Sequence, residues 1–124
     1  MAVTLEFDVW QFVRVMDALE AGRRPKGSVY AAWAEVWSEL DRRLAALAGS
    51  DPDAYAELMM DRQVTVDCAP AQVAEVATAV EGVIRRLDRE LRAKPTDRHL
   101  RDSLRFEKRE MEDLLARLRV AQKR

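Results

Sequence analysis

The stretch that decides the fold is residues 64–81, which read VTVDCAPAQVAEVATAVE. Apolar and polar side chains alternate over residues 64–67, which is the period of a half-buried strand. The apolar spacing then becomes helical, and Pro70 marks the change because proline is tolerated at the first position of a helix. Gln72 stands where a capping-box side chain reaches back to the N-cap residue. The stretch therefore predicts a short strand that leads directly into a helix ending near Ala93.

A second stretch near the start of the chain follows the same pattern. Residues 3–20 read VTLEFDVWQFVRVMDALE, and alignment with residues 64–81 places Gln11 opposite Gln72. An internal duplication would explain this alignment, and so would a chance likeness between two amphipathic stretches rich in valine and alanine. In either case the sequence predicts a strand over Val3–Phe7 followed by a helix, and the two short strands are candidates for pairing.

Length and composition indicate one compact helical protein. A chain of 124 residues is long enough to bury its own core, so we expect a single domain over residues 1–124, with residues 1–61 and 62–124 as its halves if the duplication is real. Apolar residues make up 48% of the chain and charged residues 35%, a balance typical of long amphipathic helices. Cys68 is the one cysteine, which excludes an intrachain disulfide. With no signal-peptide pattern and no run able to span a bilayer, we expect a cytoplasmic protein without membrane contact.

Helical periodicity extends over most of the remaining chain. The sequence predicts a helix from residue 9 to Gly22, a solvated basic turn over residues 23–27, a long helix over residues 30–47 and a short helix after Pro52. From residue 70 onward it predicts a helical hairpin that turns at residues 94–97. The fold class expected is mainly α: a helical bundle with a long C-terminal antiparallel helical hairpin and two short strands, or equally two strand-helix-helix halves.

The predicted hairpin is long for a chain of this size. Arms of about 24 residues measure roughly 36 Å, whereas the helix before Gly22 covers only about 20 Å of that length. Either the helix over residues 30–47 or a second chain must cover the rest, and we expect self-association as a homodimer. The residues expected to form the interaction surface lie on apolar seams of two helices: Trp33, Trp37, Leu100, Leu104, Met111, Leu114 and Leu118. Glu107 interrupts the second seam, and it either reaches solvent or pairs with an arginine across the interface.

The uneven charge distribution raises a second function. Residues 1–84 carry 7 Lys and Arg against 14 Asp and Glu, whereas residues 85–124 carry 14 against 8. Basic side chains of the hairpin could contact phosphates, and the candidates are Arg98, Arg101, Arg105 and Arg109. Acidic residues interleave with them at helical spacing, which is typical of a solvated, ion-paired face. We therefore expect an interaction or adaptor protein that acts through helix-helix association, with itself or with an unidentified protein partner, and keep a nucleic-acid-binding regulator as the alternative.

Enzymatic chemistry has little support in the sequence. The chain holds one histidine, His99, and one cysteine, Cys68, which is too few for a catalytic or transition-metal cluster. The four glycines are too dispersed for a phosphate-binding loop. We predict no catalytic, metal or cofactor site, while an enzyme or small-molecule sensor would need a pocket at the seam of Trp33 and Trp37.

Overall fold

The computed structural model describes residues 2–22, 28–61 and 64–123, and helices predominate among them. The turn expected at residues 23–27 lies outside the described residues. In chain order the elements are β1 (Val3–Phe7), α1 (Val9–Ala21), α2 (Val29–Ala32), α3 (Ala34–Ala48), α4 (Pro52–Met60), β2 (Val64–Cys68), α5 (Pro70–Arg92) and α6 (Arg98–Gln122). The mainly helical fold, the two short strands and the long C-terminal hairpin are all confirmed.

The two strands pair antiparallel with Leu5 opposite Val66. These two residues are also counterparts in the alignment of the two similar stretches, whose members lie 61 positions apart. A local two-fold axis therefore passes between them and exchanges β1 with β2. On the outer face of this small sheet, the Thr4 hydroxyl donates a hydrogen bond of 2.7 Å to the Asp67 carboxylate.

The helices that follow the strands begin in the same way. In α1, the side-chain oxygen of Gln11 accepts the backbone N–H of Asp8 at 3.0 Å. In α5, the side-chain oxygen of Gln72 accepts the backbone N–H of Ala69 at 2.8 Å. Each glutamine satisfies an N–H group at a helix start, where no intrahelical acceptor exists. The capping role predicted from the sequence for Gln72 is confirmed.

The hairpin of α5 and α6 packs against α1 through α5. Asp97 begins α6 by accepting the backbone N–H groups of His99 and Leu100 at 2.8 and 3.2 Å. At the end of α5, Lys94 takes a left-handed φ of 52°, the conformation that commonly ends a helix and that glycine adopts most easily. The seam between the two arms is buried and consists of Val73, Val76, Val80, Val83 and Leu87 from α5 with Leu104, Met111, Leu114 and Leu118 from α6.

The long helix predicted over residues 30–47 is interrupted at Trp33, which separates α2 from α3. The indole of Trp33 is buried and packs against the rings of Phe7 and Phe12, with 5.8 Å between centroids in each case. Its Nε1 donates a hydrogen bond of 2.9 Å to the backbone oxygen of Asp67. The helical periodicity of the sequence continues through this break. The backbone nevertheless changes direction at Trp33, where the side chain contacts β2 and the core, and the local sequence does not reveal this change.

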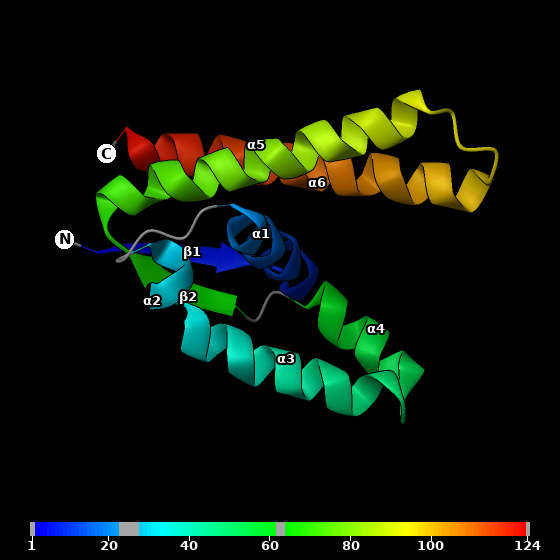
Figure 1. Cartoon of the computed structure of the whole chain (residues 1–124), viewed down its shortest axis with the longest axis horizontal. Coiled ribbons are helices and arrows are strands. Elements are labelled where there is room, and N and C mark those ends of the chain that lie inside the picture. Colours follow the sequence, from blue (N-terminus) through cyan, green and yellow to red (C-terminus); the bar gives the residue numbers. More distant parts are fainter. Residues whose placement is uncertain (1, 23–27, 62–63, 124) are drawn as a thin grey trace.

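The helices form two layers with α1 and the strands between them (Figure 1). The hairpin lies on one side, and α3 lies on the other side, where it packs against α4. The loop end of the hairpin extends beyond α1 (Figure 1). The helix α3, which the sequence allowed as a cover for the hairpin, therefore does not lie along this end of it.

Candidate interaction surface

Most of the residues predicted to form the interaction surface belong to the core of the chain. Five of the seven are buried, namely Trp33, Leu104, Met111, Leu114 and Leu118. Trp37 is partly buried and packs against Phe12 with 6.2 Å between the ring centroids. Leu100 is 49% exposed. The apolar seams are thus covered within one chain, and any docking surface must be formed by apolar side chains that remain exposed.

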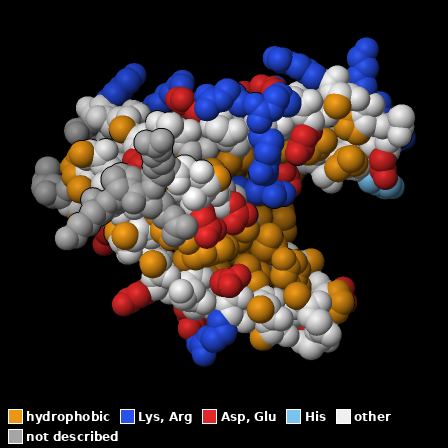
Figure 2. All heavy atoms as spheres, in the orientation of Figure 1, with side chains coloured by type: hydrophobic (Ala, Val, Ile, Leu, Met, Phe, Trp, Pro, Cys, Tyr) orange, Lys and Arg blue, Asp and Glu red, His pale blue; other side chains and the backbone are white. Residues whose placement is uncertain are grey.

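Exposed apolar side chains gather beside a cleft between the hairpin and α4. The cleft has a volume of about 470 Å³, and its lining residues come from α1, α4 and α6: Trp10, Met59, Met60, Asp102, Ser103, Phe106 and Glu107. Met60 is 56% exposed and Phe106 is 40% exposed. Figure 2 shows apolar atoms gathered in the hollow between the upper layer and the lower one. Exposed apolar groups that are contiguous and rimmed by polar ones commonly mark binding sites.

An aromatic contact and an ion pair connect α1 to α6 at this cleft. The rings of Trp10 and Phe106 lie 6.1 Å apart. Arg14, one turn after Trp10, donates a hydrogen bond of 3.2 Å to the carboxylate of Glu107, the residue that follows Phe106. Glu107 is thus the arginine-paired residue that the sequence allowed as one of two alternatives. Because the pair joins two different helices, it favours one register between α1 and α6.

The indole of Trp10 has an unfilled hydrogen-bonding capacity. Trp10 is only 6% exposed, and its Nε1 has no hydrogen-bond acceptor among the described residues. A buried donor without an acceptor costs about 1–3 kcal/mol, so the fold tolerates a penalty at this indole. The sequence gives no sign of this feature.

The arginines proposed to contact phosphates lie along one stripe of α6. Arg98, Arg105 and Arg109 are exposed, while Arg101 is partly buried. Arg98 pairs with Asp102 at 4.0 Å, one turn further along the helix. Basic side chains are spread along the upper edge of the hairpin with acidic ones between them (Figure 2). The stripe is therefore basic but interrupted by carboxylates.

An ion pair also joins the two arms of the hairpin. The Lys108 ammonium lies 2.7 Å from the Asp88 carboxylate. The hydrogen bond from Lys108 and its positive charge lower the pKa of Asp88 below its usual value. The same contact raises the pKa of Lys108. Both groups stay charged near neutral pH, which makes this pair a structural link between α5 and α6.

The histidine and the cysteine, which are the side chains best suited to catalysis or metal binding, lie in different elements. His99 is exposed at the start of α6, whereas Cys68 is buried in β2. Burial, followed by the nearby charge of Asp67, raises the pKa of the Cys68 thiol, so the thiol stays protonated at neutral pH. Among the described residues, no three His, Cys, Asp or Glu side chains are grouped so that they could hold a metal ion.

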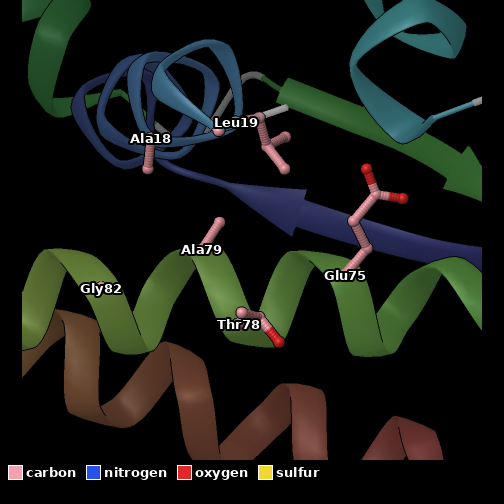
Figure 3. A pocket seen from close by; sticks show the side chains of 7 residues that line it. Ala18, Leu19, Glu75, Thr78, Ala79 and Gly82 are labelled. Carbon is pink, nitrogen blue, oxygen red and sulfur yellow. The ribbon is translucent and has the colours of Figure 1, made fainter. Parts of the chain in front are cut away.

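A second hollow, of about 380 Å³, lies between α1 and α5. Most of its lining residues are small, and Ala18 and Ala79 point toward one another across it (Figure 3). The carboxylate of Glu75 accepts the backbone N–H of Val29 at the start of α2, with 3.3 Å to each oxygen. Among the described residues that line the hollow, Glu75 is the one charged residue, and its carboxylate already binds the start of α2. The hollow therefore results from the packing of helices with small side chains.

Comparisons of the chain with models of protein families, with curated proteins and with solved structures found no match. In the part of the chain that the structure describes, no helix combines the length and apolar character needed to cross a membrane. The function must therefore be inferred from the surface itself, where the cleft between α4 and α6 brings together the exposed side chains of Met60 and Phe106.

Proposed function

We propose that this protein is a small non-enzymatic interaction or adaptor protein that works as a homodimer through helix-helix association. The observation that supports this proposal is the apolar cleft at the uncovered end of the hairpin. Three apolar side chains are each at least 40% exposed: Met60 and Phe106 in the cleft, and Leu100 nearby on the hairpin. Association would remove these side chains from water, at roughly 25 cal/mol for each Å² of apolar surface buried.

The surface proposed here differs from the apolar seams expected from the sequence. The cleft replaces Leu104, Met111, Leu114 and Leu118 as the docking surface, because those side chains already pack within one chain. Leu100 lies outside the cleft but remains part of the proposed docking surface, since its side chain is half exposed near the loop end of the hairpin. We place the homodimer in the cytoplasm, an expectation that follows from the lone Cys68 and the absence of any possible intrachain disulfide.

The test is the molar mass of the chain in solution over a range of concentrations, measured by light scattering after size exclusion. The unaltered protein is expected to show a dimer that dissociates on dilution. Phe106→Asp should raise the dissociation constant by about a hundredfold, because two equivalent charges enter an apolar contact. Val120→Asp is the matched control, since Val120 is 55% exposed on the same helix but near its other end. A monomer at all concentrations would contradict the homodimer.

Nucleic-acid binding is the second candidate, and the arginine stripe on α6 is the observation that favours it. Arg105 and Arg109 are exposed, and neither has an ion-pair partner among the described residues. Binding to a labelled duplex should weaken steeply as salt is raised, and the double substitution Arg101→Glu with Arg105→Glu should abolish it. Binding that does not respond to salt, or no binding at low salt, would eliminate this candidate.

A further inference from the structure

The cleft is bordered by acidic side chains, with Asp102 and Glu107 among its lining residues, whereas the hairpin tip is basic. Residues 51–60, which include α4, contain the acidic residues Asp51, Asp53 and Glu57 and no Lys or Arg, so their net charge is −3. Residues 89–101 form the hairpin tip, with five Lys and Arg against two Asp and Glu, and their net charge is +3. Among the described residues, no ion pair joins α4 to the hairpin. Each segment thus has charges that the other could complement.

The hairpin tip also presents apolar surface. Leu100 is 49% exposed near the start of α6, and Leu91 at the end of α5 is only partly buried. The cleft offers Met60 and Phe106, which are likewise exposed. An apolar tip surrounded by basic residues matches an apolar cleft with an acidic helix at its side. Charge complementarity of this kind directs association and disfavours other orientations.

We infer that the cleft of each copy receives the hairpin tip of a second copy, with the basic tip lying against the acidic α4 of the partner. This inference rests on the homodimer proposed above and names its contact. One chain carries both the tip and the cleft, so a single two-fold axis produces two identical contacts. Such an isologous arrangement closes as a dimer and leaves neither tip nor cleft unfilled.

Two charge-reversal variants test this contact. The tip variant carries Arg92→Glu and Arg98→Glu, and the cleft variant carries Asp53→Lys and Glu57→Lys; all four side chains are exposed. Each variant alone places like charges at both contacts, and each should raise the dissociation constant by at least about tenfold. In an equimolar mixture, a heterodimer restores opposite charges at both contacts at once. The mixture should therefore dimerise with a dissociation constant within about threefold of the unaltered protein.

A matched control and a folding check accompany the mixture. Arg117→Glu with Lys123→Glu makes the same change in charge near the other end of α6, where both side chains are exposed, and it should leave the dissociation constant unchanged. Circular dichroism verifies that each variant is folded; if one is not, the single substitutions Arg98→Glu and Glu57→Lys take its place.

The outcomes separate the inference from the proposal on which it rests. Restoration on mixing supports the contact of tip and cleft. Suppose that the unaltered protein dimerises. If the cleft variant then also dimerises normally, or if the mixture of the two variants stays monomeric, the contact of tip and cleft is wrong while the homodimer stands. If the unaltered chain is a monomer at every concentration, both the homodimer and the contact are wrong.

Discussion

Replacing Gln11 by alanine should destabilise the protein more than replacing Gln72, although both residues have the same position and role at their helix starts. Each side-chain oxygen accepts one backbone N–H, from Asp8 and Ala69 respectively. Gln11 is 1% exposed, and its Nε2 also donates to the backbone oxygen of Glu110 at 3.4 Å. Gln72 is only partly buried.

The magnitudes follow from this difference in burial. Gln72→Ala removes a capping hydrogen bond at an exposed helix start, where the freed N–H can turn to water, a loss of about 1 kcal/mol. Gln11→Ala removes the same bond and the contact with α6, and leaves a partly buried N–H and a small cavity, for a total of about 2–3 kcal/mol. For a chain of 124 residues, each kcal/mol corresponds to about 4 °C in Tm.

The assay is thermal unfolding followed by helical circular dichroism at one fixed chain concentration, because dimerisation would add to the apparent stability. We expect Gln72→Ala to lower the Tm by about 4 °C and Gln11→Ala by about 8–12 °C. Equal losses for the two variants would refute the reasoning, since they would show that burial and the contact with Glu110 contribute nothing.

Three further predictions concern the hairpin. Met111→Asp should unfold the chain and not merely dissociate a dimer, because Met111 is fully buried within the chain; a folded monomer by circular dichroism and light scattering would contradict this. The lowered pKa of Asp88 means that its pair with Lys108 stabilises the fold above the unfolded pKa of the carboxyl and is lost as pH falls through the folded pKa. Asp88→Asn should therefore flatten the stability curve in acid, and an unchanged curve would dismiss the pair. Lys94→Gly should raise stability by about 0.5–1 kcal/mol in urea unfolding by relieving a left-handed backbone, and any loss of stability would argue against that strain.

The surface that we propose for docking could not be predicted in full from the sequence. The sequence marked Leu104 and Met111 as members of an apolar stripe, and the structure shows that α5 and the rest of the core cover this stripe. Periodicity identifies which side chains share a face of a helix, but it does not identify the element that packs on that face. Phe106 lies off the seam. Its place at the cleft became clear only from the structure, which brings it against Trp10, a residue nearly 100 positions earlier.

Local chemistry was sufficient to predict the bounds of several elements. Alternating side chains predicted β1 and β2, Pro70 predicted where α5 begins, and the turn expected at residues 94–97 predicted the approximate start of α6. These features act over a few residues, so the sequence by itself determined them. The break at Trp33, the pair of Arg14 with Glu107 and the cleft beside α4 were decided only by the tertiary structure. Each depends on packing between segments far apart in the chain, and side-chain periodicity within one segment holds no record of its distant neighbours.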